Sequence, residues 1–162
     1  MARVYVSIGS NIGREQNIRA GVAELRARFG TLILSSVYES EAVGFDGDSF
    51  YNLVAGFDTA LAPQQVAEAL RVIEEAHGRV RNGPRFSSRT LDIDLLLYDD
   101  LILHEGKLEI PRDEITKNAF VLWPLAEIAP QLKHPQQGVT YGELWATFDR
   151  QSQPLWPVAF EF

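Results

Sequence analysis

Cysteine is missing from this sequence of 162 residues, and its absence excludes disulfides, thiolate metal ligands and a cysteine nucleophile. Basic residues are scarce as well: 15 Lys and Arg stand against 22 Asp and Glu, which gives a formal net charge of −7. Because proteins that bind nucleic acid usually present a basic surface, we expect no nucleic-acid partner. A chain without cysteine suits a reducing compartment, so we expect a cytoplasmic protein.

Long apolar runs are lacking too, since the longest ones are far too short to span a bilayer. The first residues do not show a basic segment followed by an apolar run, as a secretory signal would. Neither an internal repeat nor a linker divides the chain. These features predict one soluble domain over residues 1–162, without a membrane partner, that acts as a monomer or a weak homodimer.

The periodicity of the apolar residues predicts four strands and two long helices. Alternating or β-branched segments indicate strands at residues 3–8, 31–38, 51–59 and 91–98. Helical spacing indicates one helix that stops at Gly30 and another that runs from Pro63 to Gly78. The order strand, helix, strand, strand, helix, strand is typical of ferredoxin-like α+β domains, in which helices pack on an antiparallel sheet. The remainder mixes short apolar pieces with prolines, and only residues 142–148 indicate a further short helix.

The segment "RTLDIDLLLY", residues 89–98, contains two acids within an otherwise apolar strand. Alternation of side chains puts Asp92 and Asp94 on one face, about 7 Å apart. The other face is expected to be wholly apolar and to carry Leu91, Ile93, Leu95 and Leu97. Two neighbouring carboxylates repel each other and lose solvation when they are buried, so a positive group should compensate them.

Two kinds of compensating group stay open. Arginines crowd the eleven residues 79–89, and they could form a structural ion-pair network with the aspartates. A divalent cation is the alternative, because Mg²⁺ prefers oxygen ligands and typically takes one or two carboxylates together with substrate phosphates. Arginines would then bind the remaining phosphate oxygens. This second set is what phosphoryl-type transfer requires, although the usual glycine-rich phosphate loops are absent from the sequence.

Four segments together resemble one known family. They are "VYVSIGSNIG", "YNLVAGFDT", "IEEAHGRVRNGPRF" followed by "RTLDIDLLLY", and "NAFVLWPLAEIAP", and they run in order from residue 3 to about residue 135. The chain resembles the 6-hydroxymethyl-7,8-dihydropterin pyrophosphokinases of folate biosynthesis. The resemblance implies a ferredoxin-like fold and transfer of the β,γ-pyrophosphoryl unit of ATP to the hydroxymethyl group of the pterin. It further implies that AMP leaves and that two Mg²⁺ ions assist.

The resemblance also assigns roles to individual residues. Catalytic positions are Arg79, Arg89, Asp92 and Asp94, with the two aspartates as metal ligands. Pterin-binding positions are Phe50, Asn52, Phe120 and Val43, with the two aromatic rings on either side of the pterin. ATP-binding positions are Glu74, Arg81, Phe86, Leu95 and Arg112.

The residue types of the pterin site agree with this assignment. Two rings hold a flat heterocycle well, and the amide of Asn52 offers both a donor and an acceptor. An amide within an apolar strand needs partners, because leaving it unpaired when buried costs about 1–3 kcal/mol. The alternative is that Phe50 and Phe120 are ordinary core residues, since buried phenylalanine is common.

The chain also departs from the family pattern. Arg112 and Asp113 stand where the family usually has a histidine followed by an aromatic residue or proline, and Phe86 stands where a tryptophan is usual. The tail at residues 150–162 has no counterpart, and its alternating apolar residues predict packing on the body or on another subunit. Two alternatives therefore stay open: a non-catalytic or altered-substrate paralogue that binds pterin or nucleotide, and another metal-dependent transferase that acts on nucleotide sugars.

Overall fold

A computed structural model describes residues 1–41, 49–78 and 90–162 of the chain. Its centre is a six-stranded antiparallel sheet with the strand order β5-β1-β4-β3-β8, in which β2 also pairs with β4. The strands are β1 (Ala2–Ser10), β2 (Ile33–Leu34), β3 (Val37–Ser40), β4 (Phe50–Thr59), β5 (Asp92–Tyr98) and β8 (Leu155–Val158). With β2 and β3 counted as one interrupted strand, the first six elements confirm the predicted β-α-β-β-α-β order and the ferredoxin-like α+β fold.

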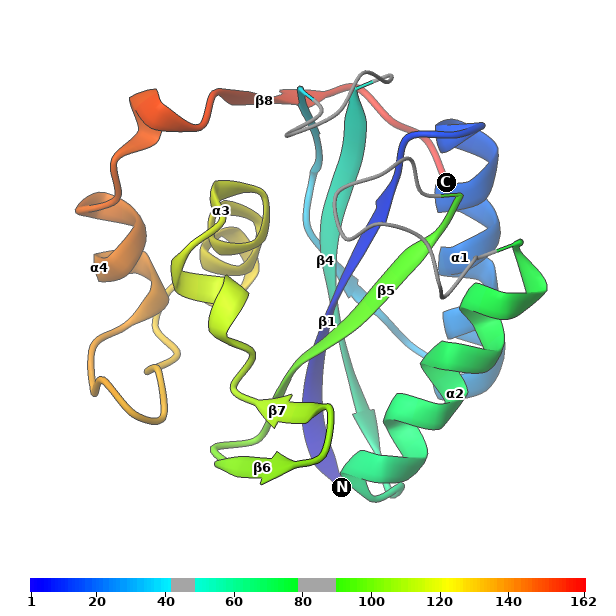
Figure 1. Cartoon of the computed structure of the whole chain (residues 1–162), viewed down its shortest axis with the longest axis horizontal. Helices are drawn as coiled ribbons and strands as arrows, with labels where there is room; N and C mark the ends of the chain where they lie inside the picture. The colour runs from blue at the N-terminus through cyan, green and yellow to red at the C-terminus, as the bar shows by residue number, and fades with distance from the viewer. Residues whose placement is uncertain (42–48, 79–89) are drawn as a thin grey trace.

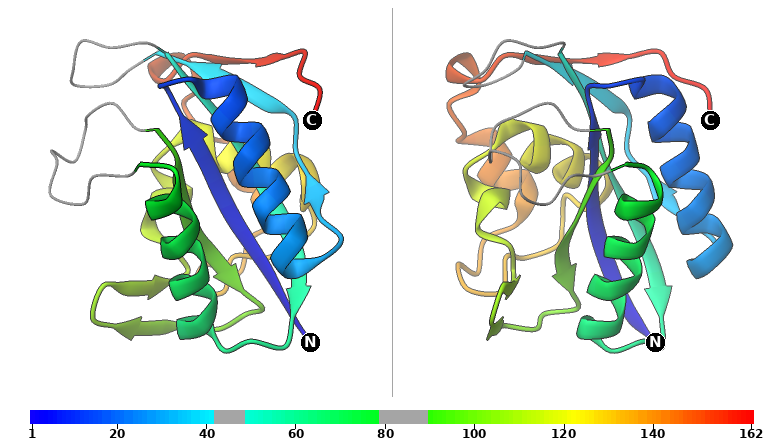
Figure 2. Two further views of the ribbon diagram at one scale, coloured as in Figure 1. Left: turned by 90° about the vertical axis from the view of Figure 1, so that its right-hand side faces the viewer. Right: turned by 45° about the vertical axis from the view of Figure 1, so that its right-hand side comes forward.

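Two helices cover one face of the sheet, α1 (Arg14–Phe29) and α2 (Pro63–Ala76) (Figures 1 and 2). Both were predicted, and α1 ends at Gly30, whose positive φ of 80° suits glycine. The helices bury apolar residues at helical spacing against the first core, with Ile18, Val22 and Leu25 from α1 and Val66, Leu70 and Ile73 from α2.

Two further helices, α3 (Ala119–Ile128) and α4 (Tyr141–Ala146), lie on the opposite face (Figure 1). They close a second core that includes Val54, Leu122 and Leu125. The short helix predicted at residues 142–148 corresponds to α4, whereas α3 was not predicted. Most of α3 is buried and Pro124 lies inside it, so its sequence shows neither a polar face nor the usual composition of a helix.

The predicted strand at residues 31–38 is divided by Ser35 and Ser36. The hydroxyl of Ser35 accepts a hydrogen bond from the Val54 backbone N–H at 2.9 Å, in place of a backbone carbonyl. The backbone N–H of Ser36 donates to both carboxylate oxygens of Glu127, at 3.0 and 3.1 Å. Side chains thus satisfy backbone groups that a continuous ladder would have used, and the strand breaks there.

A β-bulge interrupts the expected alternation of side chains between the two faces of β5. Val6 pairs with Leu95 but Tyr5 pairs with Leu97, so Leu96 is the extra residue on β5. Beyond it the faces exchange: Leu97 lies in the second core with Leu96, and Tyr98 packs against the first core. The expectation that Leu97 shares a face with Leu91, Ile93 and Leu95 was therefore wrong, because a bulge shifts the two-residue period by one.

The rest of the chain frames the second core. A hairpin of β6 (Leu103–Glu105) and β7 (Leu108–Ile110) leads into the 3₁₀ turn η1 (Asp113–Thr116). After α4, the 3₁₀ turn η2 (Arg150–Ser152) precedes β8, which pairs with β3 and extends the sheet. The tail thus packs on the body of the protein, one of the two arrangements expected. In the part of the chain that the structure describes, we find no helix long and apolar enough to cross a membrane.

Candidate active site

Three carboxylates meet at the edge of the sheet where β5 begins. Asp92 and Asp94 are half-buried on β5, and Glu74 reaches them from the last turn of α2. Each contributes an oxygen that lies within 4.8 Å of the other two. Because β5 is an edge strand, its outward N–H groups are accessible, and the Ile93 N–H donates to Glu74 Oε2 at 2.9 Å. We call Glu74, Asp92 and Asp94 the acidic cluster; its oxygen-only donor set suits a hard divalent cation.

Arg112 lies against the acidic cluster. Its backbone N–H donates to the carbonyl of Leu96, the bulged residue of β5, at 3.0 Å. Its Nη2 is 3.6 Å from Asp94 Oδ1 and 3.2 Å from Glu114 Oε1, while its Nε is buried and makes no hydrogen bond in the structure. Burial opposes the charge, but Asp94, Glu114 and Asp92 outweigh it and raise the pKa of Arg112 above its ordinary value. Arg112 therefore provides a fixed positive charge beside the carboxylates.

Asp113, the other departure from the family pattern, does not share that position. Its carboxylate is 2.9 Å from the Lys117 Nζ, and its side chain is 58% exposed. An exposed pair of this kind contributes little to stability, and Lys117 offsets the charge of Asp113 locally. An unpaired aspartate at this position would repel a bound phosphate, and the ion pair with Lys117 reduces that repulsion.

Asn52 lies in the same row of the sheet as Asp92. Asp92 pairs with Gly9, Gly9 pairs with Asn52, and Asn52 pairs with Tyr38 across four adjacent strands. Neighbouring strands are about 4.8 Å apart, so Asp92 and Asn52 are roughly 10 Å apart across β1. A Cβ at Gly9 would lie 2.6 Å from Asn52 Oδ1. The absence of a side chain at Gly9 therefore leaves room for the Asn52 amide beside β1.

Buried polar contacts hold the surroundings of Asn52. Its side chain is 8% exposed, and its Nδ2 donates to Ser40 Oγ at 3.4 Å. The neighbouring Tyr38 hydroxyl donates to Glu127 Oε1 at 2.7 Å, and its ring lies 4.6 Å from that of Trp123. Burial, and then Glu127, raise the pKa of Tyr38 well above its usual range. Glu127 thus ties α3 to β3, a contact that the sequence analysis missed because its partners lie 89 and 91 residues away.

The remaining predicted residues fall into three groups. Phe50 shares its face of β4 with Asn52, two residues away, and Phe120 is half-buried in the first turn of α3, which packs on that same face. Leu95 is only 5% exposed and its side chain packs in the first core, so its assignment as an ATP contact stays a prediction. The other predicted positions lie outside the described residues: Val43, Arg79, Arg81, Phe86 and Arg89.

An open polar pocket of about 290 Å³ is lined by Asn11, Gly13, Arg14 and Ser49, and Ser49 directly precedes Phe50. The acidic cluster does not line it. The sequence analysis did not single out these four residues, because their side chains meet only after α1 and β4 have come together. Asn11 and Gly13 lie in the segment "VYVSIGSNIG", and Ser49 lies two residues before the strand predicted at 51–59, but neither pattern indicated a pocket.

The model of the 7,8-dihydro-6-hydroxymethylpterin-pyrophosphokinase (HPPK) family matches residues 5–130 of this chain. The chain belongs to the HPPK family. A 2-amino-4-hydroxy-6-hydroxymethyldihydropteridine pyrophosphokinase from Pseudomonas aeruginosa is 42% identical over 137 residues, which cover 82% of this chain and 84% of that protein. One from Synechocystis is 36% identical over 157 residues, which cover 95% of this chain and 79% of that protein. The predicted family is thereby confirmed, and residues beyond 130 lie outside the HPPK match.

Solved structures agree on the fold. The Plasmodium falciparum HPPK-DHPS wild type superposes with a TM-score of 0.72 and 15% identity, over 93% of this chain and 45% of that longer chain. Another structure, of an HPPK-DHPS in complex with substrates, gives a TM-score of 0.73 at 12% identity and covers 44% of that chain. This chain thus spans less than half of those proteins, and at such identities the likeness concerns the fold alone.

Proposed function

We propose that this protein transfers the pyrophosphoryl group of ATP to the hydroxymethyl group of 6-hydroxymethyl-7,8-dihydropterin and releases AMP, in folate biosynthesis. Membership of the HPPK family supports the reaction. The observation that carries the proposal in this chain is the row Asp92, Gly9 and Asn52, which joins the acidic cluster to a buried amide on one face. Phosphates bound at one end of this row and a pterin at the other would be neighbours across Gly9.

In the proposed reaction the hydroxymethyl oxygen attacks the β-phosphorus of ATP. A bond forms between that oxygen and the β-phosphorus, and the bond from the β-phosphorus to the oxygen bridging to the α-phosphorus breaks. AMP leaves with the bridging oxygen, and the hydroxyl proton passes to solvent. The protein's part is positioning and charge compensation: Asn52 orients the pterin edge and Arg112 binds phosphate oxygens.

The donor atoms of the acidic cluster fit magnesium. Carboxylate oxygens within 4.8 Å of one another are the ligands that Mg²⁺ takes, together with water and substrate phosphate. We propose that Asp92 and Asp94, with Glu74 beside them, hold Mg²⁺, and that the reaction uses two ions. Bound Mg²⁺ would neutralise negative charge on the phosphates and polarise them.

The other predicted contacts complete this proposal. Phe50 and Phe120 would enclose the pterin ring, with Val43 beside it, because flat heterocycles bind well between aromatic side chains. Arg79, Arg81 and Arg89 would bind phosphate oxygens. The side chains of Glu74 and Phe86 would lie next to the nucleotide. We also propose that residues 1–162 act as a single domain in the cytoplasm, as a monomer or weak homodimer. Light scattering in solution would test the oligomeric state.

One assay tests the function directly. The protein is incubated with ATP, Mg²⁺ and 6-hydroxymethyl-7,8-dihydropterin, and AMP is measured over time. We expect AMP in equal amount to the pyrophosphorylated pterin, and none when ATP, the pterin or Mg²⁺ (removed with EDTA) is left out. Formation of ADP in place of AMP, or AMP without the pterin, would contradict the proposal.

A second candidate function is binding of pterin or nucleotide without turnover. It is favoured by the position of Arg112, whose Nη2 lies 3.6 Å from Asp94 Oδ1, so that a built-in cation already stands beside a proposed metal ligand. Calorimetry that shows pterin or nucleotide binding, together with an AMP assay that shows no product, would favour this candidate over the enzyme.

The Arg112→Ala variant separates the two roles of Arg112. If Arg112 binds phosphate, we expect the KM for ATP to rise about 10-fold or more, since a hydrogen bond to a charged group contributes roughly 1.5–3 kcal/mol. Arg112→Lys should recover only part of this, because lysine keeps the charge and loses the planar fork. Steady-state kinetics over a range of ATP and Mg²⁺ concentrations provides the measurement.

Lys107→Ala is the matched control, because Lys107 is an exposed cation in the turn of the β6–β7 hairpin, the segment that leads to Arg112. We expect parental kinetics from this control. If Arg112→Ala instead lowered the Mg²⁺ concentration needed for half-maximal rate and raised the rate, Arg112 would be a competitor of the metal and not a ligand of ATP.

A further inference from the structure

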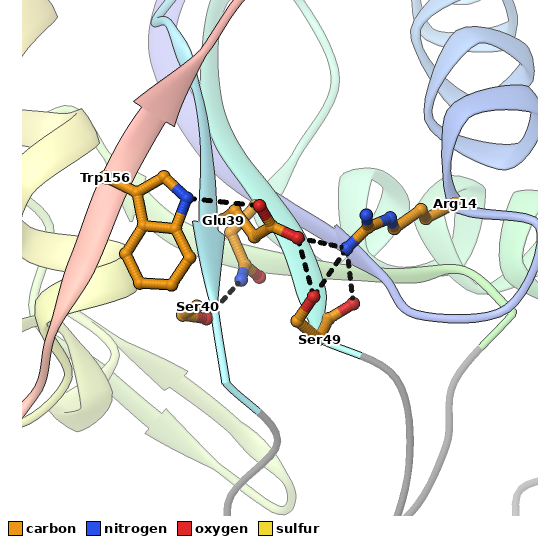
Figure 3. Close-up of polar contacts among 6 residues, drawn as sticks. Arg14, Glu39, Ser40, Ser49 and Trp156 are labelled. Atoms are coloured by element: carbon orange, nitrogen blue, oxygen red, sulfur yellow. Dashed lines mark hydrogen bonds and ion pairs between the residues drawn. The ribbon is translucent and has the colours of Figure 1, made fainter.

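The C-terminal tail, which follows the residues matched by the HPPK family model, contacts a polar cluster beside the proposed pterin site. The cluster consists of Arg14, Glu39 and Ser49, and we call it the polar bracket (Figure 3). Arg14 Nη1 donates to Glu39 Oε2 at 2.7 Å, to Ser49 Oγ at 2.7 Å and to the Ser49 carbonyl at 3.0 Å. The Ser49 hydroxyl in turn donates to Glu39 Oε2 at 2.7 Å. Every member of the bracket therefore contacts the other two.

The bracket stands at both ends of the chain segment that connects β3 to β4. Glu39 lies on β3 directly before Ser40, and Ser49 comes directly before Phe50, the first residue of β4. Ser40 and Phe50 are paired across the two strands, and Ser40 accepts the hydrogen bond of Asn52. Arg14 thus links the end of β3 to the start of β4. The residues that follow Glu39 and Ser49, which are Ser40 and Phe50, belong to the proposed pterin site.

The tail holds this bracket from outside. Trp156 on β8 is the register partner of Glu39, and its Nε1–H donates to Glu39 Oε1 at 3.1 Å (Figure 3). Glu39 thus uses one carboxylate oxygen for Trp156 and the other for Arg14 and Ser49. The Ser49 hydroxyl contributes most to a lowered pKa of Glu39; burial opposes it, and Arg14 and Trp156 add to it. Glu39 is therefore held as a carboxylate, the form that accepts all three hydrogen bonds.

A second residue of the tail, Phe160, is connected to the polar bracket through Tyr51. The Arg14 guanidinium lies over the ring of Tyr51, 3.9 Å from its centroid, and Tyr51 meets Phe160 edge to face at 6.0 Å. The guanidinium of Arg19 lies 4.8 Å from the centroid of Phe160, and its Nε donates to the Glu161 carbonyl at 2.7 Å. Tyr51 stands between Phe50 and Asn52 in β4, so its backbone is shared with both proposed pterin contacts.

We propose that the C-terminal strand positions the pterin-binding side of the site, with Trp156 acting through Glu39 and the polar bracket on the β3 and β4 ends that carry Ser40, Phe50 and Asn52. The contacts of Trp156 and Phe160 lie on the α1 face of these strands, while Asn52 lies on the α3 face with Val54. Trp156 therefore reaches Asn52 through the shared backbone, and it is a positioning residue. Another part of the tail contacts the start of α3 separately, where Gln153 Oε1 accepts a hydrogen bond from the Ala119 N–H at 2.8 Å. This inference rests on the proposed function for its substrate.

The Trp156→Phe variant of the full chain tests the inference, because it keeps an aromatic ring and removes only the N–H donor. One net hydrogen bond corresponds to about a fivefold change. We therefore expect the KM for the pterin to rise about fivefold, with the KM for ATP and the melting temperature unchanged. Glu39→Gln should show a similar selective loss. The double variant should lose little more than either single one, because both changes break one chain of contacts.

Glu109→Gln is the matched control for Glu39→Gln. It neutralises a half-exposed carboxylate on β7, which belongs to the separate β6–β7 hairpin and lies far from β8 (Figure 1), and we expect parental kinetics from it. A Trp156→Phe variant with the parental KM for the pterin would overturn the inference. Equal losses for pterin and ATP, with a lower melting temperature, would also overturn it, because they indicate a merely structural strand.

Hydrogen exchange in the ligand-free protein keeps the test independent of turnover. In Trp156→Phe we expect amides of residues 37–40 and 49–52 to exchange about fivefold faster, while those of β5 and α2 keep the parental rate. Parental rates at residues 49–52 would refute the positioning role even if the parental protein formed no AMP. An inactive parental protein with the expected exchange pattern would refute the proposed function and leave the link from the tail to β3 and β4 in place.

Discussion

Replacing Asp94 with asparagine should lower the rate of AMP formation by about 10³-fold or more. Removing one carboxylate from the acidic cluster removes an anionic oxygen ligand of the proposed Mg²⁺ site, and such a metal site supplies several kcal/mol of charge stabilisation in the transition state. The fold should persist, because the change relieves repulsion among three close carboxylates and leaves Arg112 paired with Glu114. Steady-state AMP formation and thermal unfolding with and without Mg²⁺-ATP measure both effects.

Asp100→Asn is the control for Asp94→Asn, since Asp100 is an exposed carboxylate in the turn that follows β5. We expect parental rates from it, and a melting temperature that rises with Mg²⁺-ATP as in the parental protein. In Asp94→Asn that rise should be much smaller. A variant that kept near-parental rates would show that Asp94 binds no metal and that the acidic cluster belongs to a structural network with arginine.

Replacing Gly9 with alanine should lower kcat/KM for the pterin by about 100-fold. The new Cβ would lie 2.6 Å from Asn52 Oδ1, so the amide must move away from the position where it would meet the pterin. Displacement of a positioning group by about 1 Å can cost on the order of 100-fold in rate. Because Asp92 lies on the other side of Gly9, the KM for ATP should change much less. Initial rates at varied pterin and varied ATP separate the two.

Two further variants make this test specific. Asn52→Ala should resemble Gly9→Ala, and the double variant should be no worse than either, since both act on the same amide. Gly56→Ala is the steric control: its Cβ would lie 2.8 Å from Tyr5 Cε1, within the same sheet but in a different row. We expect Gly56→Ala to lower the melting temperature without a selective loss for the pterin. A similar selective loss in both glycine variants would contradict the role of Asn52.

The fold could be predicted as far as its periodicity was regular. The helix of Ile18, Val22 and Leu25 has one buried side, and the strand at residues 3–8 shows alternation and β-branched residues, so the sequence indicates both elements directly. The helix α3 could not be recognised, because most of its residues are buried and Pro124 interrupts the pattern. The bulge at Leu96 was hidden as well, since Leu95, Leu96 and Leu97 are all apolar and any face assignment would satisfy the sequence.

The candidate site was predictable where one strand carries the unusual residues. Asp92 and Asp94 in β5 and Asn52 in β4 are polar residues in apolar strands, and that contrast is visible without a structure. The sequence could not show that Glu74 accepts a hydrogen bond from the edge of β5. Nor could it show that the Arg112 N–H donates to the carbonyl of the bulged residue, because both contacts depend on tertiary packing. The assignment of Leu95 stays a prediction, because the resemblance assigns a position and does not say which face the side chain occupies.

The last strand also changes what the sheet offers to other molecules. Without β8, β3 would be an edge strand whose free backbone groups could pair with a strand of another chain, and such pairing commonly leads to aggregation. With β8 in place, the edge strand is β8 itself, which is as short as β3 and includes Pro157, which has no N–H to donate. The short strand β8 thus opposes aggregation of the protein at high concentration.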